Sequence, residues 1–301
     1  MIQQCAYKLL ENLPKEITNN KRLNNKRLNN NKINLILEGG AFNGSYHVGA
    51  LYFLKEMEKK KYIQIHNISA TSIGTIAALL YYSDLLEESL QSHSLLRSIY
   101  KKTKTLNAIP TFLNQIREKL PANLLSSLNG KLYISYYNIK TGCKIVKSKY
   151  KNIDDLFTTI LRSCFVPFFI NGQMTIDNKY IDGITPYIFP NKKYKCLNIS
   201  LIGSDKFHQI FVIKNEDTNI HKILAGLLDI NLFITTNIPT QMCSYINDRS
   251  IKQRLFYNVL FIIEKIIVFI LFLYYHSKNK IYNTNIFVKI INLLIKEYCI
   301  N

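Results

Sequence analysis

Apolar residues along the chain fall alternately into short runs and into helical spacing. The first apolar run, residues 33–38, ends at a pair of glycines and predicts a buried strand. Residues 46–59 then carry apolar side chains at helical spacing, 63–69 form a second strand-like run, and Ile73–Tyr82 predicts a buried helix. A unit of strand, turn and helix thus occurs twice in succession, which is typical of a mainly parallel sheet flanked by helices.

The rest of the chain is expected to mix helices and strands as well. The predicted elements are a helical stretch at 84–128 interrupted by Pro110 and Pro121, a hairpin of 131–139 with 143–150, a helix at 153–164, a hairpin of 173–176 with 179–181, and strands at 197–201 and 209–213. From residue 220 onward the pattern is helical and very apolar. We therefore expect a folded α/β domain at 33–250 and a helical tail at 251–301.

Charge and cysteine usage limit the partners and the compartment. Lys and Arg total 39 against 20 for Asp and Glu, which favours anionic partners such as membrane phosphates or nucleic acid. The alternative is a composition that is rich in Lys, Asn, Ile and Tyr throughout the chain. The N-terminal segment, residues 1–32, is basic and polar; its stretch 19–32 contains a KRLNN repeat and predicts a linker or tail. The 6 cysteines lie far apart and no leader peptide is evident at the start, so we expect a reducing, intracellular (cytoplasmic) setting.

A serine stands between the second predicted strand and the following helix, in Ala70-Thr71-Ser72-Ile73-Gly74. This is the context of a nucleophile elbow, in which a sharp turn lifts a serine above the edge of the sheet. The free N–H groups at the start of the helix favour an anion that develops there. The alternative is an ordinary helix N-cap serine.

A glycine-rich turn, Gly39-Gly40-Ala41 through Gly44, follows the first strand and precedes a helix. Such a turn exposes successive backbone N–H groups, which can hold a phosphate or an oxyanion. A dinucleotide loop is the alternative, but the spacing is not G-x-G-x-x-G and no acidic residue ends the next strand. An oxyanion hole explains the turn better.

Asp182-Gly183 is the third piece, although Asp-Gly alone is a common turn dipeptide. A serine nucleophile needs a base, and the 6 histidines show no pairing pattern with Ser72. Taken in this order, the glycine turn, the ATSIG elbow and the late Asp-Gly resemble the motifs of the patatin-like phospholipase family. The stretch LRSCFVPFF at 161–169 and the hairpin at Thr141-Gly142 support the resemblance, which covers residues 33–204. It is strongest toward the adiponutrin-like and large-DNA-virus branches of the family, and a viral origin is one interpretation.

The resemblance implies a three-layer α/β sandwich with a mainly parallel central sheet and a Ser–Asp dyad without a catalytic histidine. Ser72 would attack an ester carbonyl and Asp182 would take its proton, while the N–H groups of Gly39, Gly40 and Ala41 hold the oxyanion. The expected substrates are phospholipids or related glycerolipids, and no cofactor or metal is expected. Burial is expected to raise the pKa of Asp182, because a carboxylate with an ordinary pKa is a poor base for an alcohol.

The chain departs from the family pattern at a few positions. Ala70 and Ala41 each replace a glycine, Asn43 stands where a basic residue is common, and Ile184 follows Asp-Gly where a second glycine is usual. These changes leave Ser72 in place, but they bear on rate and on substrate geometry. They also leave two alternatives open: a transacylase, and a non-catalytic membrane-bound interaction protein that retains the fold. Nucleic-acid binding rests on charge alone and ranks last.

The apolar stretch 255–275 is long enough to span a bilayer, but Glu264 and Lys265 lie near its middle. Its aliphatic and Phe residues favour insertion by roughly 4.5 to 9 kcal/mol, and the two charges cost on the order of 5 to 7 kcal/mol. The sum is near zero, so a helix lying in the membrane interface is the preferred interpretation, with a second amphipathic stretch at 285–298. Packing of both stretches on the core is the alternative. The sequence leaves the oligomeric state open.

Overall fold

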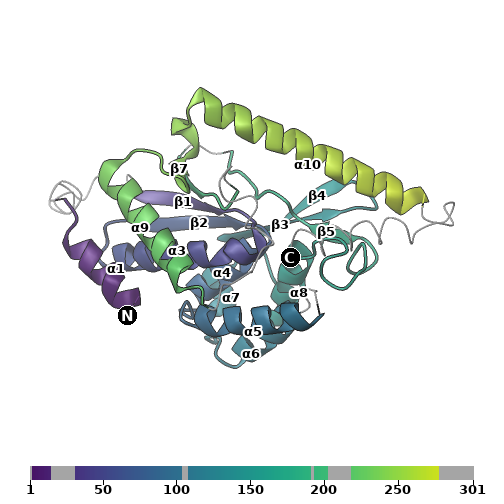
Figure 1. The fold of residues 1–301 in the computed structure, drawn as a ribbon, viewed down its shortest axis with the longest axis horizontal. Helices are drawn as coiled ribbons and strands as arrows, with labels where there is room; N and C mark the ends of the chain where they lie inside the picture. Colours follow the sequence, from purple (N-terminus) through teal and green to yellow (C-terminus); the bar gives the residue numbers. More distant parts are fainter. Residues whose placement is uncertain (1, 15–30, 104–107, 191–192, 203–217, 278–301) are drawn as a thin grey trace.

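The computed structural model describes residues 2–14, 31–103, 108–190, 193–202 and 218–277, and these form one mixed α/β domain (Figure 1). The strands are β1 (Lys32–Leu37), β2 (Gln64–Ala70), β3 (Leu132–Asn138), β4 (Cys143–Lys147), β5 (Tyr180–Asp182), β6 (Lys195–Ile199) and β7 (Cys243–Tyr245). The helices are α1 (Ile2–Glu11), α3 (Gly44–Lys59), α4 (Ile73–Tyr82), α5 (Glu88–Thr103), α6 (Ile109–Arg117), α7 (Leu124–Leu128), α8 (Ile153–Ser163), α9 (Ile220–Thr236) and α10 (Ile251–Ser277).

The strands form a 7-stranded sheet in the order β4-β3-β2-β1-β6-β7, and β5 also pairs with β3. Strands β3, β2, β1 and β6 at its centre are parallel to their neighbours, whereas β4, β5 and β7 are antiparallel. The strand, turn and helix repeat near the start of the chain therefore produces the mainly parallel sheet that the sequence predicts.

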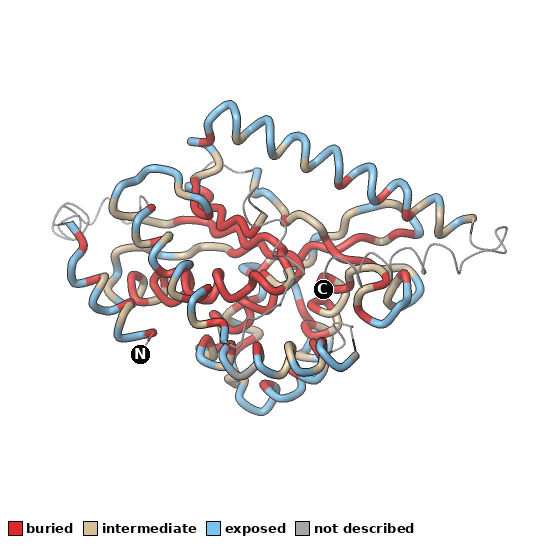
Figure 2. The backbone as a smooth tube through the Cα atoms, in the orientation of Figure 1, coloured by how far each residue is buried: buried red, intermediate tan, exposed pale blue. Residues whose placement is uncertain are grey.

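The two faces of the sheet differ in polarity. Successive side chains of a strand point to opposite faces, and Leu35 and Leu37 of β1 belong to the main apolar core with helices α3, α4 and α9. Figure 2 shows the buried backbone concentrated in the sheet and in the helices on this side. Ile36 and Glu38 instead face a cavity that is also lined by residues of α10. Helix α10 thus covers the opposite face and completes a three-layer arrangement (Figure 1).

Helices α3 and α9 approach each other closely at two glycines. A Cβ atom on Gly49 would lie 1.8 Å from the carbonyl oxygen of Ile223, and one on Gly226 would lie 2.1 Å from that of Tyr46. Only a residue without a side chain permits this backbone contact. The crossing fixes α3, whose N-terminus carries the glycine-rich turn.

The helical stretch 84–128 consists of α5, α6 and α7, with Pro121 between α6 and α7. Pro110 lies in the first turn of α6, where its missing N–H has no intrahelical partner in any case.

Some predicted elements differ from those observed. Residues 173–176 form no strand, and only an isolated bridge joins Ile176 to Tyr180, because β5 takes its main partner from β3. Strand β7 was not predicted. The predicted strand 209–213, the amphipathic stretch 285–298 and most of the segment 19–32 lie outside the described residues.

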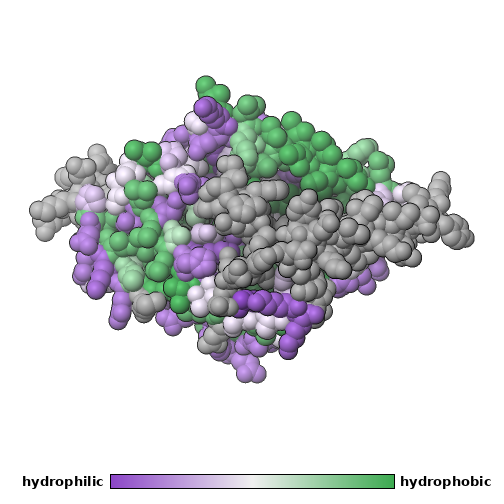
Figure 3. Space-filling view, in the orientation of Figure 1, coloured by the Kyte–Doolittle hydropathy of each residue, from purple (hydrophilic) through white to green (hydrophobic). Residues whose placement is uncertain are grey.

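Helix α10 is attached to the domain along one narrow side. Its buried residues are Glu264, Val268 and Leu271, and the last two pack in a second apolar cluster with Tyr137 and Ile181. Much of the remaining surface of α10 consists of exposed apolar side chains, which Figure 3 shows along the upper right edge of the molecule. Helix α10 has 27 residues and contains an 18-residue stretch with a mean hydropathy of 2.3, and among the described residues it is the one helix long and apolar enough to cross a membrane.

Candidate active site

Strand pairing explains how Ser72 and Asp182 come to the same place. The first half of β3 pairs with β2, ending at the pair Ala70 and Ile134, while its second half pairs with β5 through Tyr136 and Asp182. Because β4 occupies the other edge of β3 over this stretch, β5 lies on the same edge as β2 and continues its line. The turn that carries Ser72 therefore leaves the end of β2 next to the end of β5 that carries Asp182.

Ser72 adopts a backbone conformation that is rare for residues other than glycine, with φ 50° and ψ −132°. Its N–H donates to the Ser163 hydroxyl at 3.0 Å, and that hydroxyl donates to the carbonyl oxygen of Ser135 at 2.7 Å. The turn is closed by Gly74, where a Cβ atom would lie 2.7 Å from the carbonyl oxygen of Leu37. The Ser72 side chain makes no capping hydrogen bond to α4, which argues against an ordinary N-cap role.

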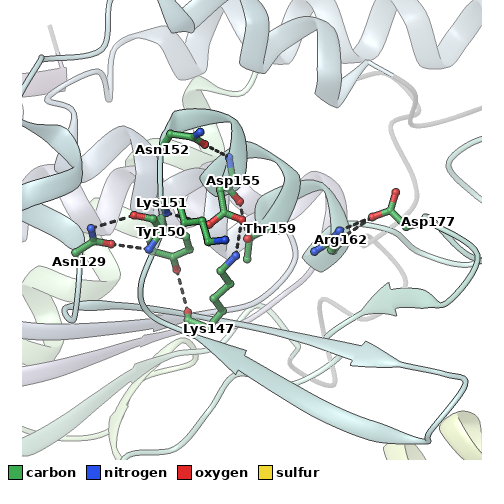
Figure 4. A network of polar contacts seen from close by, with 9 residues as sticks. All are labelled: Asn129, Lys147, Tyr150, Lys151, Asn152, Asp155, Thr159, Arg162 and Asp177. Carbon is green, nitrogen blue, oxygen red and sulfur yellow. Dashed lines mark hydrogen bonds and ion pairs between the residues drawn. The ribbon is translucent and has the colours of Figure 1, made fainter.

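Helix α8, which carries Ser163, is anchored by the polar network of Figure 4. At its start, the Asn152 side chain accepts from the N–H of Asp155 at 2.8 Å, and the Asp155 carboxylate accepts from the Lys147 amine at 2.5 Å. At its end, Arg162 donates to Asp177 at 2.8 Å. Both ends of the helix are tied to neighbouring segments, so Ser163 is held at a defined distance from the elbow.

The glycine-rich turn packs directly against the elbow. A Cβ atom on Gly39 would lie 3.0 Å from the Cβ of Ser72, and one on Gly44 would lie 2.3 Å from a side-chain carbon of Ile73. The N–H groups of Gly39, Gly40 and Ala41 donate to no other described residue. Unpaired backbone donors beside a serine side chain are what an oxyanion hole requires.

His47 stabilises this turn, a role that the sequence did not indicate. Its Nε2 donates to the carbonyl oxygen of Glu38 at 2.8 Å, and the side chain is completely buried. Burial lowers the pKa of His47 to about 4, against the opposing effect of that hydrogen bond, so the imidazole is neutral at pH 7. The only sequence signal for this contact is the position of the histidine on the first turn of α3.

Asp182 is 7% exposed and lies at the end of β5. One carboxylate oxygen accepts from the N–H of Ile184 at 2.7 Å, and the other, Oδ2, is buried without a hydrogen bond to a described residue. Burial raises the pKa of Asp182 to about 6, while the side chain of Ser72, the Ile184 N–H and the charge of Lys144 oppose the rise. The carboxyl group thus has the protonation range of a general base that operates near neutral pH.

Gly183 allows the chain after Asp182 to pass close to the elbow. A Cβ atom there would lie 2.2 Å from the carbonyl oxygen of Ser135 and 2.4 Å from the Thr71 hydroxyl. Ile184 follows with φ 58°, a conformation that a β-branched residue rarely adopts. Ile184, which replaces the usual glycine of the family, therefore has the left-handed backbone conformation that glycine adopts without strain.

A buried charge cluster joins this segment to α10. Glu264 of α10 accepts hydrogen bonds from Tyr137 at 2.7 Å, Lys144 at 2.9 Å and Thr185 at 2.6 Å. The Glu264 side chain is fully buried, whereas Lys144 is partly exposed. The charge of Glu264 raises the pKa of Asp182 and that of Lys144 lowers it. The one sequence signal for this cluster was the glutamate within an otherwise apolar helix.

The described residues contain no group of three or more His, Cys, Asp or Glu side chains that could hold a metal ion. The structure does bring together the three sequence motifs: the glycine-rich turn, the serine elbow and Asp182-Gly183. Each is positioned by a different strand of one sheet, β1, β2 and β5. A strained serine between unpaired N–H donors and a buried carboxyl group defines a candidate acyl-transfer or ester-hydrolysis site.

The fold and this site agree with the comparison to known families. The chain belongs to the patatin-like phospholipase family, whose model matches residues 35–185. The chain is 27% identical over 146 residues to human (Homo sapiens) 1-acylglycerol-3-phosphate O-acyltransferase PNPLA3, which covers 45% of this chain and 30% of that protein. It is 22% identical over 201 residues to patatin-like phospholipase domain-containing protein 2 of Mus musculus, covering 63% of this chain and 40% of that protein. The chain thus spans less than half the length of these relatives.

Proposed function

We propose that the protein hydrolyses carboxylic ester bonds of phospholipids or related glycerolipids, with Ser72 as nucleophile and Asp182 as its general base. The observation that carries the proposal is the convergence of the strained Ser72 and the buried Asp182 at the ends of β2 and β5. Membership in the family supports a reaction on lipid acyl groups.

The geometry supports a two-step reaction. The ionised Asp182 takes the hydroxyl proton of Ser72 as the serine oxygen attacks the ester carbonyl, and the N–H groups of the turn at Gly39, Gly40 and Ala41 stabilise the oxyanion. Collapse of this intermediate expels the alcohol, which takes the proton from Asp182, and leaves an acyl-enzyme. Water then attacks the acyl-enzyme as Asp182 accepts its proton, and this proton returns to the Ser72 oxygen when the fatty acid leaves. With a pKa of about 6, Asp182 is mostly ionised at pH 7 and yet basic enough to assist.

Acyl transfer is the second candidate function. The similar human protein carries the name of an acyltransferase, and the same acyl-enzyme would serve both reactions if an alcohol replaced water in the second step. The two outcomes differ only in the acceptor. The ratio of released fatty acid to newly acylated lysolipid distinguishes them.

We also propose that the protein acts on lipid at a membrane surface, with α10 lying in the interface. Exposed apolar side chains run along the helix, among them Ile262, Ile266 and Phe269. The buried Glu264 keeps the opposite side of α10 on the domain, and a helix that crossed the bilayer would lose this contact. One apolar side facing outward and one side attached to the protein suit an interfacial helix.

The proposed function is tested by fatty-acid release from mixed phospholipid and glyceride vesicles. Ser72→Ala and Asp182→Asn are each expected to lower the rate about 10³-fold or more, because nucleophile and base act as a unit. Ser126→Ala and Asp154→Asn, which remove an exposed serine and an exposed aspartate, serve as matched controls and should retain wild-type rates. Release that persists in Ser72→Ala would show that the nucleophile is wrongly assigned, and no release by wild type would favour a binding role.

A further inference from the structure

A cavity of about 440 Å³ lies between α10 and the polar face of the sheet. This volume is within the range of small-molecule sites, which span about 300 to 1,000 Å³. Most of the lining is apolar, with contributions from Ile36 of β1, Ile188 after β5, and Leu260 and Phe261 of α10. An apolar lining of this extent suits a hydrocarbon chain.

A buried arginine with an unsatisfied hydrogen-bond donor lies in the wall of this cavity. Arg249 is 7% exposed, and among the described residues its Nε has no hydrogen-bond acceptor and its guanidinium forms no salt bridge. Its guanidinium lies over the ring of Tyr257 at 3.5 Å from the centroid. A buried donor that has no acceptor is costly, so an anion in the cavity would be stabilised by this guanidinium.

The carboxyl group that lines the same cavity, that of Glu38, is held by hydrogen bonds to other residues. It accepts from the Ser200 hydroxyl at 2.5 Å and from the Asn198 amide at 2.9 Å. Burial raises the pKa of Glu38, against the effects of these two hydrogen bonds and of the charge of Arg249. Arg254, whose guanidinium donates to backbone carbonyls of residues 249 and 247, also lines the cavity, so positive charge prevails there.

We propose that this cavity binds a long-chain fatty acid, with the guanidinium of Arg249 contacting the carboxylate and the apolar wall holding the chain. A carboxylate matches the planar fork of a guanidinium and carries a single charge. One guanidinium balances one negative charge, so a doubly charged phosphate monoester would keep a second, unbalanced charge in the apolar cavity.

The cavity adjoins the candidate active site at two points. Glu38 directly precedes Gly39 of the turn, and Ile184, which also lines the cavity, follows Asp182 by two residues. A fatty acid released at Ser72 would therefore form beside its binding site. This connection rests on the proposed function, whereas binding of an added fatty acid does not.

The test uses the full chain with Ser72→Ala, so that no ester chemistry is involved. Binding of palmitate and of 1-hexadecanol, which has the same chain without the charge, is measured by displacement of a fluorescent fatty acid. Palmitate is expected to bind about tenfold more tightly, since a hydrogen bond to a charged group stabilises binding by about that factor. Arg249→Met should abolish this preference and leave hexadecanol binding unchanged.

Arg117→Met is the matched control, because Arg117 also lies over an aromatic ring, that of Phe157, but outside the cavity. It should preserve the preference for palmitate. Leu260→Trp, which fills the cavity, should weaken both ligands. If Arg249→Met unfolds, Arg249→Lys retains the charge and is expected to reduce the preference without removing it.

Equal affinity of the protein for palmitate and hexadecanol would overturn the proposal, as would tighter binding of lysophosphatidate than of palmitate. Unchanged binding in Leu260→Trp would place the ligand elsewhere. Palmitate binding by the Ser72→Ala protein, combined with a wild type that releases no fatty acid from vesicles, would support the cavity and reject the proposed reaction. The two proposals therefore fail independently.

Discussion

Three residues around the candidate site have backbone conformations with positive φ: Ala41 at 39°, Ser72 at 50° and Ile184 at 58°. Each such conformation in a residue other than glycine costs on the order of 1 to 3 kcal/mol and persists only where the surroundings enforce it. Here the surroundings are the close contacts between the two turns and the carboxyl group of Asp182. Two of the three residues replace glycines that the family pattern leads one to expect, so this chain keeps the geometry at a higher energetic cost.

The environment of Asp182 predicts the pH dependence of the reaction. Because burial raises its pKa to about 6, the carboxyl group becomes protonated and inactive as a base below that pH. We expect kcat/KM to fall about tenfold per pH unit below pH 6 and to level off above it. The measurement is a pH series of initial rates on a soluble ester. A flat profile between pH 5 and 7 would contradict the assignment of Asp182 as the base.

The same shift makes a stability contribution of defined sign. The folded state keeps the Asp182 proton up to about pH 6, whereas the unfolded chain, in which the pKa is ~3.9, releases it at lower pH. The stabilisation of the folded state by this bound proton is therefore complete below pH ~3.9 and is lost as the pH rises to about 6. Above pH 6, the free energy of unfolding of Asp182→Asn should therefore exceed that of wild type by up to about 3 kcal/mol, measured by urea denaturation. The difference should vanish near pH 4.

At the scale of elements, α10 is linked to the candidate site through one buried carboxylate. Glu264 joins Tyr137 of β3, Lys144 of β4 and Thr185, which follows Asp182 by three residues. Three donors offset much of the cost of burying its charge. The position of α10 and the electrostatic environment of Asp182 are therefore coupled.

Glu264→Gln tests this coupling. Loss of the negative charge leaves Lys144 without its ion pair and removes a charge that raises the pKa of Asp182. We expect the free energy of unfolding to fall by about 1 to 3 kcal/mol. The acid limb of kcat/KM should move to lower pH, which a purely structural change would not cause. Lys265→Gln, at the exposed neighbouring position, is the control. An acid limb of kcat/KM that stays at the same pH in Glu264→Gln would argue against the coupling.

At the scale of the whole molecule, the exposed apolar surface of α10 and the formal net charge of +19 point to an anionic lipid surface as partner. Replacing Ile262, Ile266 and Phe269 together by Ser should reduce co-flotation with anionic vesicles about tenfold or more, because each side chain is largely exposed and contributes about 1.5 to 3 kcal/mol when buried in an apolar environment. The helix itself should remain on the domain, since Glu264 and the residues around it are unchanged.

The matched control replaces exposed apolar residues elsewhere on the protein: Leu228 and Leu232 of α9 and Ile238, each by Ser. These changes remove comparable apolar surface and should leave flotation unchanged. An equal loss in both triple variants would indicate nonspecific adsorption. No loss in the α10 variant would assign membrane contact to another region of the chain.

The sequence predicted the elements whose pattern is local. Strand β1, helix α3, strand β2 and helix α4 follow from apolar runs, helical spacing and glycine turns, because hydrophobic periodicity and turn chemistry act over a few residues. The order of the motifs also indicated the family, which the comparison confirmed. The elevated pKa of Asp182 was expected from the role that the family resemblance implies, because a carboxylate with an ordinary pKa is a poor base for an alcohol.

The tertiary structure decided what depends on partners distant in the chain. The pairing of β5 with β3 instead of residues 173–176 brings Asp182 to the elbow, and no local pattern specifies the partner of a short strand. The contact of His47 with Glu38 and the unsatisfied Nε of Arg249 are likewise set by neighbours in space. Glu264 looked like a cost within an apolar helix, and only the donors from three separate segments made its burial favourable. Local sequence determines which elements form, whereas long-range packing determines which polar groups meet, because the energy of a buried charge depends on its surroundings.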